Sequence, residues 1–242
     1  MLYQTDLHLA PFDETGLLSE LAVKIHGAVM HAIPTEYARK LHESAYHPFS
    51  VFAVQTTEGY IVRISALNEE ACQITEAIGR LASVRIFGCN QNRPVPIISR
   101  DSAPPADAET IERYVSAKGC RLTFVTPAVI KTGGRFSIKP EIGGYFQSVM
   151  KKYNEYEGKS LCWTEVQTTF QNVRFGAYSL QSTEYILTGR AVPGMTGFCE
   201  LLFPEEPAQN LLLRKLTAYA AYCGIGAKTG QGMGGVLVQD IP

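Results

Sequence analysis

A glycine-rich stretch near the end of the chain, "YCGIGAKTGQGMGGVLV" (Tyr222–Val238), has the composition of a phosphate-contacting loop. Its glycines surround Lys228 and are Gly224, Gly226, Gly230, Gly232, Gly234 and Gly235. Successive backbone N–H groups in such a loop can hold an anion, and the missing side chains let an extended polyanion approach the backbone. The structural alternative is a left-handed helix cap at Gly224 followed by a β-bulge.

Two well-known nucleotide-binding loops are excluded. Ala227 stands directly before Lys228-Thr229, where a Walker loop needs glycine. The pattern Gly230-x-Gly232-x-x-Gly235 satisfies GxGxxG, but we expect a strand after it, whereas the dinucleotide-binding fingerprint needs a helix. An unrelated nucleotide-binding enzyme is therefore the least favoured function that we consider.

The imidazoles of His42 and His47 are the candidates for proton transfer. They lie in "ARKLHESAYHPFSVF" (38–52), where a short helix is expected to end. An imidazole titrates near pH 6.5 when unperturbed, so it can accept or donate a proton. A single loop histidine is more often an ordinary surface residue. We expect His8 to be solvated or structural, and His26 and His31 to lie at the surface beside the apolar stripe of a helix.

The composition is that of a globular protein without a membrane span. The chain has 242 residues, of which 45% are hydrophobic and 19% charged. It contains no apolar run long enough for a membrane helix, and its first residues do not resemble a secretory signal. Its scattered cysteines indicate a reducing compartment. We therefore expect a cytoplasmic protein that needs no metal or other cofactor.

Charge is distributed unevenly along the chain. The overall net charge is −1. Residues 1–117 carry 9 Lys and Arg against 14 Asp and Glu, a net of 9 − 14 = −5, and residues 118–242 carry 13 against 9, a net of 13 − 9 = +4. The second half can therefore present an anion-binding face, although solvated surface charge would give the same count.

The first half predicts one β-α-β-β-α-β unit, residues 1–117. Alternating residues predict a strand in "LYQTDLHLA" (2–10), and a helix with its cap at Asp13 or Thr15 follows. The other predicted elements are a short helical turn (35–43), a hairpin (49–56 and 59–67), a helix (68–82) and a strand that begins with "VRIFG" (84–88). Residues 101–110, "DSAPPADAET", are interpreted as a linker or hinge.

The second half, residues 118–242, repeats this order. It predicts a strand (121–130), a helix that begins at Pro140, a hairpin from residues 166–180 and 184–203, a helix (206–223) and a closing strand (234–240). Each half thus matches the split βαβ plan. The predicted fold class is α+β, with two tandem ferredoxin-like domains.

Four segments resemble the CRISPR-associated endoribonucleases, a family of the repeat-associated RNA-binding superfamily that processes precursor CRISPR RNA. "GIGAKTGQGMGGV" resembles the signature loop of that family, "LTFVTPAVI" and "GMTGFCELLF" resemble two strands of its second half, and residues 38–52 resemble its catalytic helix end and loop. The resemblance covers nearly the whole chain.

The resemblance implies RNA cleavage without an obligatory metal, through attack of a ribose 2′-OH on the adjacent phosphorus. The products are a 2′,3′-cyclic phosphate and a free 5′-OH. His42 matches the catalytic histidine and is expected to act as general base, or alternatively as acid. His47 is the second choice, as acid or as a cation, and Tyr46 and His31 are held in reserve.

The expected partner is CRISPR repeat RNA, as precursor and product. We expect RNA contacts from Gly224, Gly226, Lys228, Gly230, Gly232 and Gly234 of the loop and from Lys131, Arg135 and Arg174 elsewhere; Lys139, Lys151, Lys152 and Arg190 are further phosphate-contact candidates. Subunits of a CRISPR effector complex are possible partners of a monomer or homodimer. The alternative function is a non-catalytic RNA-binding subunit of such a complex, which would not need the pair of histidines.

Overall fold

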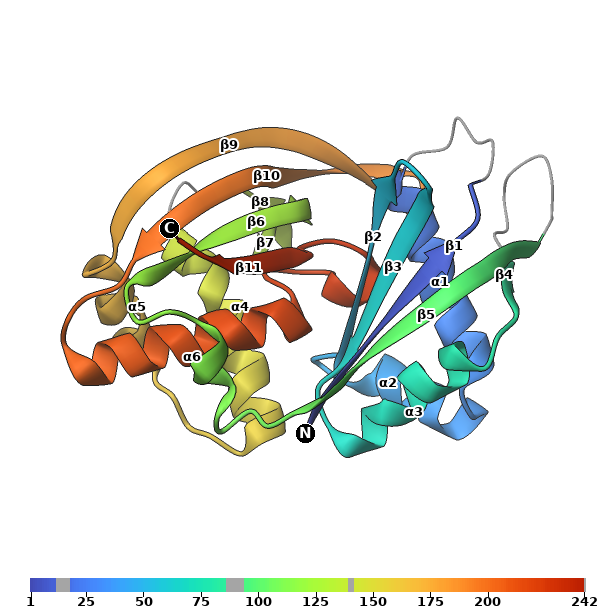
Figure 1. Cartoon of the computed structure of the whole chain (residues 1–242), viewed down its shortest axis with the longest axis horizontal. Coiled ribbons are helices and arrows are strands. Elements are labelled where there is room, and N and C mark those ends of the chain that lie inside the picture. The colour runs from blue at the N-terminus through green and yellow to red at the C-terminus, as the bar shows by residue number, and fades with distance from the viewer. Residues whose placement is uncertain (12–17, 86–93, 139–141, 242) are drawn as a thin grey trace.

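The computed structural model describes residues 1–11, 18–85, 94–138 and 142–241, which form two helix-covered antiparallel sheets (Figure 1). The first unit contains β1 (Leu2–Leu9), α1 (Leu18–Ala32), α2 (Thr35–Glu43), β2 (Phe49–Thr56), β3 (Gly59–Ala66), α3 (Glu69–Gly79), β4 (Ser83–Arg85) and β5 (Pro94–Ala106). The second contains η1 (Ile111–Tyr114), β6 (Gly119–Ala128), β7 (Ile130–Thr132), β8 (Arg135–Ser137), α4 (Ile142–Glu157), α5 (Trp163–Gln171), β9 (Arg174–Leu187), β10 (Arg190–Leu202), α6 (Pro207–Cys223), η2 (Thr229–Gln231) and β11 (Val236–Asp240).

Both sheets follow the ferredoxin-like plan, which confirms the predicted fold class. The strand orders are β2-β3-β1-β5-β4 and β11-β6-β10-β9. In each unit the first strand, β1 or β6, therefore lies between one strand of the central hairpin, β3 or β10, and the closing strand, β5 or β11. The domain boundary between residues 117 and 118 stays a prediction. Ile111 and Val115, which precede that boundary, are buried in the core of the second unit.

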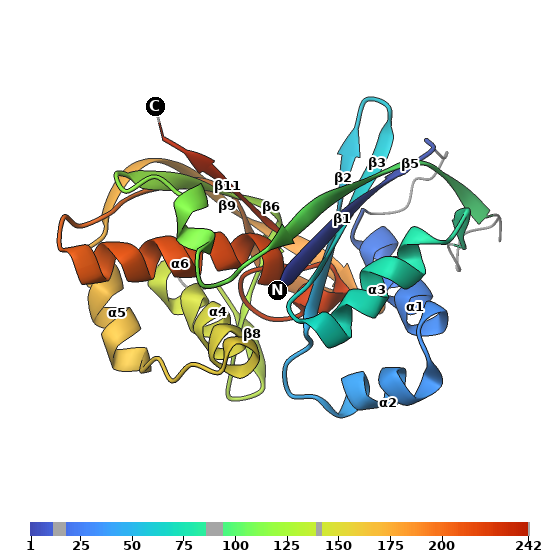
Figure 2. The ribbon, with the colours of Figure 1, turned by 60° about the horizontal axis from the view of Figure 1, so that its bottom comes forward.

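Helices cover one face of each sheet. Figure 2 shows α1 and α3 against the first sheet, and α4 and α6 against the second. Leu7 and Leu9 point from β1 toward Ile25 and Val29 of α1, because alternate strand residues share a face and helix residues four apart form a stripe. None of the helices within the described residues is long and apolar enough to cross a membrane.

The predicted linker at residues 101–110 is wrong, because residues 101–106 belong to β5. This strand pairs with β1 from Leu9 to Leu2 and takes the closing position that we expected for the strand beginning with "VRIFG". Its register shifts between the partners Leu2 and Gln4, next to Pro104 and Pro105. Proline cannot donate to a ladder and is accommodated at such irregularities. The described part of the expected strand is β4, which pairs only with β5.

The predicted hairpin in the second half began too early. Residues 166–171 belong to helix α5. Its capping box has the usual Glu, Glu165, but Cys162 stands at the N-cap, where Ser or Thr is usual. The β9–β10 turn lies at Thr188-Gly189, beyond the predicted position. The β7–β8 hairpin was not predicted. Asp13, Thr15, Lys139 and Pro140 lie outside the described residues.

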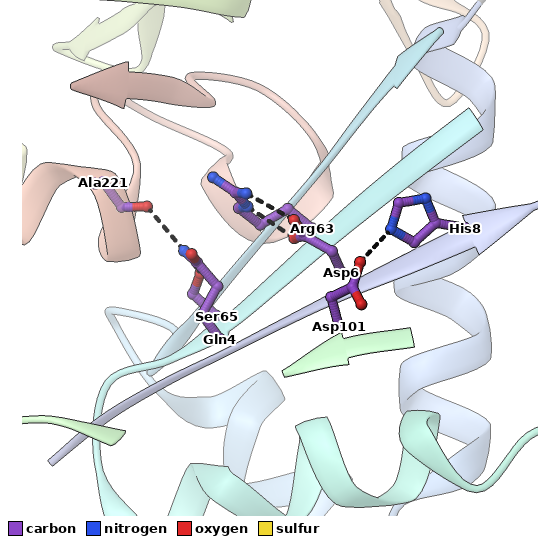
Figure 3. A network of polar contacts seen from close by, with 7 residues as sticks. All are labelled: Gln4, Asp6, His8, Arg63, Ser65, Asp101 and Ala221. Carbon is purple, nitrogen blue, oxygen red and sulfur yellow. Dashed lines mark hydrogen bonds and ion pairs between the residues drawn. The ribbon is translucent and has the colours of Figure 1, made fainter. Parts of the chain in front are cut away.

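The helix-free face of the first sheet carries a row of polar pairs (Figure 3). Arg63 on β3 donates two hydrogen bonds to Asp6 on β1, at 2.8 and 2.6 Å. His8 pairs with Asp101 of β5 at 2.8 Å, so its predicted structural role is confirmed. Gln4 contacts the carbonyl of Ala221 in α6 at 3.5 Å, which links this face to the second unit.

The β9–β10 hairpin arches from the second unit to α1 of the first (Figure 1). Near its tip, Tyr185 and Val192 form a small buried cluster with Met233 of the glycine-rich stretch, and Val23 of α1 packs against it. Gly232 also lies at this contact between the β9–β10 hairpin and α1. A β-carbon on Gly232 would stand 2.0 Å from the Tyr185 hydroxyl oxygen and 2.3 Å from the β-carbon of Ala22.

Gly232→Ala should therefore destabilise the protein far more than a glycine substitution in open space. Its φ of +100° already disfavours a side chain, and the steric overlap adds to that strain. We expect a loss of roughly 2–4 kcal/mol in the free energy of unfolding, measured by urea denaturation. Gly189→Ala is the matched control, since its φ is +77° and no atom lies within 4 Å of the added carbon. Equal losses for the two variants would contradict this account of the packing.

Candidate active site

The loop that carries His47 is held between the two units. Helix α2 ends at Glu43, and the Ser44 hydroxyl donates a hydrogen bond of 2.6 Å to the carbonyl of Tyr46. The same carbonyl accepts a hydrogen bond from the hydroxyl of Tyr156, which belongs to α4 of the second unit. This shared acceptor fixes the loop against α4 and leaves His47 half-buried.

The glycine-rich stretch forms a tight loop rather than an extended platform. Lys228 has a left-handed φ of 64°, η2 follows it, and Gly232 is left-handed again. Several of the loop N–H groups already donate to other parts of the second unit. The N–H of Ala227 donates to the carbonyl of Val129 at 2.7 Å, and that of Gly226 donates to the hydroxyl of Ser148 at 2.7 Å. The N–H groups of residues 228–230 have no acceptor among the described residues, and residues 226–231 border a cleft.

The glycines of this loop have packing reasons for lacking side chains. A β-carbon on Gly230 would stand 3.0 Å from His47 Nδ1, and one on Gly235 would stand 2.5 Å from the ring of Phe52. Gly224 and Gly234 are buried and crowded by the loop itself. Lys228 is the exposed residue of residues 224–236. The prediction that the glycines contact RNA stays a prediction, and close packing within the loop or against the first unit already gives these four glycines a structural role.

His26 joins the imidazole cluster, although the sequence interpretation placed it at the surface. It is buried on α1, and its ring Nδ1 lies 2.7 Å from the carbonyl oxygen of Gly230, so Nδ1 carries the proton that it donates. Its ring lies nearly parallel to that of His47, with 6.1 Å between centroids, and both rings stack against Phe49. The one feature of the sequence that could have indicated its burial was its position next to Ile25, on the apolar stripe of α1.

Burial and positive neighbours keep these imidazoles neutral. Burial, and then the charges of His26 and Lys152, lower the pKa of His47 to about 4. Burial also lowers the pKa of His26, while its hydrogen bond to Gly230 opposes the shift. The charge of His42 contributes to both shifts, so this exposed side chain on the last turn of α2 lies near the pair.

A buried lysine supports the loop from the second unit. The ammonium of Lys152 on α4 donates to the carbonyl oxygen of Cys223 at 2.7 Å and to the hydroxyl of Thr229 at 2.5 Å. Burial lowers its pKa. Lys152 was a candidate for phosphate contact, and the structure shows that its donors are directed at the loop. It therefore connects α4 to η2, which in turn contacts His26.

A cleft of about 960 Å³ brings these parts together. It is lined by His47, Tyr46, the loop residues and four lysines, and no Asp or Glu lines it among the described residues. Of the predicted site residues, those that border it are Tyr46, His47, Lys131, Lys151, Lys152, Gly226, Lys228 and Gly230; those that do not are His31, His42, Gly224, Gly232, Gly234, Arg135, Arg174 and Arg190. The described residues contain no group of three or more His, Cys, Asp or Glu able to hold a metal ion.

The arrangement suits a polyanion. A cleft with four lysines and no lining carboxylate concentrates positive potential, although the whole chain is close to neutral. The neutral imidazole of His47 at its wall can accept a proton, and unpaired N–H groups can stabilise negative charge.

The chain is similar to known proteins over most of its length. A family model described as CRISPR-associated endoribonuclease Cas6 matches residues 122–236. Proteins of that name from Mycobacterium tuberculosis and Streptococcus thermophilus are similar to the chain. The first is 24% identical over 237 residues, covering 94% of this chain and 74% of the relative. The second is 23% identical over 235 residues, covering 91% and 92%.

Solved structures share the fold along the whole chain. A Cas6 product complex superposes with a TM-score of 0.79 at 20% identity, covering 98% of this chain and 99% of the other. Thermus thermophilus Cas6 superposes with a TM-score of 0.74 at 19% identity, covering 98% of each chain. The chain is thus similar to CRISPR-associated endoribonucleases in sequence and shares their fold.

Proposed function

We propose that the protein cleaves CRISPR repeat RNA in the precursor transcript without a metal ion, yielding guide RNAs with a 2′,3′-cyclic phosphate and a 5′-OH at the cut. The observation that carries the proposal is the cleft, in which His47 and the glycine-rich loop face one volume lined by lysines and by no described carboxylate. Two of the similar solved structures are a Cas6 product complex and a Cas6 substrate mimic complex, and the similar Cas6 proteins are endoribonucleases, which supports RNA as the occupant.

In this proposal His47 is the proton acceptor, in place of the role as acid or cation expected for it from the sequence. A pKa of about 4 leaves this imidazole neutral at physiological pH, so it can take the proton of the 2′-OH. The 2′-oxygen then attacks phosphorus, the bond from phosphorus to the 5′-oxygen breaks, and that oxygen takes a proton from His42. Lys228 and the N–H groups of residues 228–230 stabilise the charge on the phosphorane.

Cleavage should continue in EDTA and should stop when the ribose on the 5′ side of the scissile phosphate is 2′-deoxy. The reason is that the attacking nucleophile is the 2′-oxygen itself. The measurement is a gel assay with labelled repeat RNA, followed by identification of the product ends. Cutting of the deoxy substrate, or loss of cutting that Mg²⁺ restores, would rule the mechanism out.

His42→Ala and His47→Ala should each lower the single-turnover cleavage rate by roughly 10²–10⁴-fold, the usual contribution of a general acid or base. His8→Ala is the control, since His8 pairs with Asp101 outside the cleft. RNA binding, measured by gel shift, should survive in all three variants. If wild-type protein binds repeat RNA tightly and never cuts it, the chain is the non-catalytic RNA-binding subunit instead.

Lys152→Met should raise the pKa of His47, because the ammonium opposes protonation of the nearby ring. The acid limb of the kcat/KM profile, which reports the free enzyme, should move upward from about pH 4 by the same amount. Lys151→Met is the matched control, since Lys151 borders the cleft but is exposed. NMR titration of the His47 ring checks the shift without RNA, and an unchanged pKa in Lys152→Met would contradict the electrostatic link.

A further inference from the structure

Besides His47 and the glycine-rich loop, residues of α4, α5 and β9 of the second unit line the cleft, and the part that they line is called the arm below. Helix α4 contributes Gly143, Gln147 and Lys151 to its lining, and α5 contributes Trp163 and Gln167. Residues four apart lie on one helical face, so each helix presents a continuous wall. The whole cleft has a volume of about 960 Å³, at the upper end of the range of roughly 300–1,000 Å³ for ligand pockets. This volume is larger than a single phosphodiester requires.

The walls of this arm carry amide groups that are free to bind. Gln147, Gln167 and Gln171 border the cleft, and their side chains have no hydrogen-bond partner within the described part of the chain. Each amide offers both donors and an acceptor, the combination that reads the edge of a nucleobase. No lining carboxylate among the described residues competes for those donors.

Phe170 of α5 adds an apolar ring to the lining of the arm. The ring of Phe170 packs on buried Phe146 with 4.4 Å between centroids. Gly143 permits this packing, because a β-carbon there would stand 2.9 Å from the β-carbon of Phe170. The arm therefore has a rigid aromatic surface next to its polar walls.

Phe175, at the start of β9, is an apolar ring left open to solvent. It borders the cleft and is 52% exposed. An exposed ring beside lysines and free amides is a suitable stacking surface for a base, whose face tolerates any sequence.

We propose that this arm is a nucleobase subsite, which stacks one unpaired base of the RNA on Phe175 and reads its edge with Gln147, Gln167 and Gln171. The inference rests on the proposed function, because the phosphate of that nucleotide lies toward His47 and Lys228. Lys131 and Lys151, which also border the cleft, neutralise the backbone on either side. The subsite selects the nucleotide next to the cut and performs no chemistry.

The test combines Phe175→Ala with repeat RNAs that carry one abasic nucleotide at each position flanking the cut. Stacking on an aromatic ring contributes enough that Phe175→Ala should weaken RNA binding by roughly 5-fold or more, raising KM with little change in the rate at saturation. One abasic position should weaken wild-type binding equally and should have no further effect on Phe175→Ala. Tyr178→Ala is the matched control, because Tyr178 is 69% exposed on the same strand but does not border the cleft.

A second variant tests the edge contacts. Gln167→Ala combined with Gln171→Ala should reduce discrimination between bases at that same position, while Gln181→Ala, an exposed glutamine outside the cleft, should not. The subsite is overturned if wild-type protein cuts repeat RNA but Phe175→Ala behaves like Tyr178→Ala, or if its defect is the same at every abasic position. Failure of wild-type protein to bind or cut repeat RNA would instead contradict the proposed function.

Discussion

The hydrogen bond between the His26 ring and the carbonyl of Gly230 is the contact on which the site depends. It crosses from α1 of the first unit to η2 of the second and spans 2.7 Å between two buried groups. A buried hydrogen bond adds about 1 kcal/mol, and leaving one partner unsatisfied costs roughly 1–3 kcal/mol. The bond also sets the His26 tautomer, which orients the ring against His47. Together with the packing of β2 against η2, it holds the loop of the second unit against the imidazoles of the first.

The electrostatics of the site follow from the same burial. Burial lowers the pKa of both His47 and His26, and the charges of His26 and Lys152 lower that of His47 further, so these two rings are neutral. The described lining of the cleft holds no carboxylate to offset its lysines. Such a site is incomplete without an anion. A bound phosphodiester would supply the missing negative charge and would raise the pKa of His47, so substrate binding itself prepares that ring to hold the abstracted proton.

The sequence predicted those parts of the fold whose pattern is local. Alternation predicted β1, because burial of one face of a strand imposes that period, and the β2–β3 hairpin and helix α6 were also predicted close to their observed bounds. The errors came from residues whose roles depend on distant partners. The prolines of β5 are tolerated at a register shift against β1, and α5 is capped by Cys162, which is not a usual cap residue. Neither compensation is visible in a local window.

The sequence predicted which segments form the site better than it predicted the contacts that bring them together. His47, the second-choice catalytic residue, shares one cleft with the glycine-rich loop, whereas His42, the first choice, does not border it. The burial of His26 could not be read from α1, since an amphipathic helix does not show what covers its edge. The glycines indicated closeness to some surface, and the side chains that crowd Gly230, Gly232 and Gly235 come from the first unit or from the β9–β10 hairpin.

The position of the loop just before β11 is a consequence of the tandem plan. The strand β11 pairs with β6 alone, antiparallel, so the segment that precedes it lies where β6 ends, beside Val129. That end of β6 faces β2 of the first unit, and the contact of β2 with η2 places Phe49 against His26 and His47. The first unit contains the histidines, and the second contains the glycine-rich loop and the lysines that line the cleft. The chemistry therefore requires both copies of the fold, in contact, within one chain.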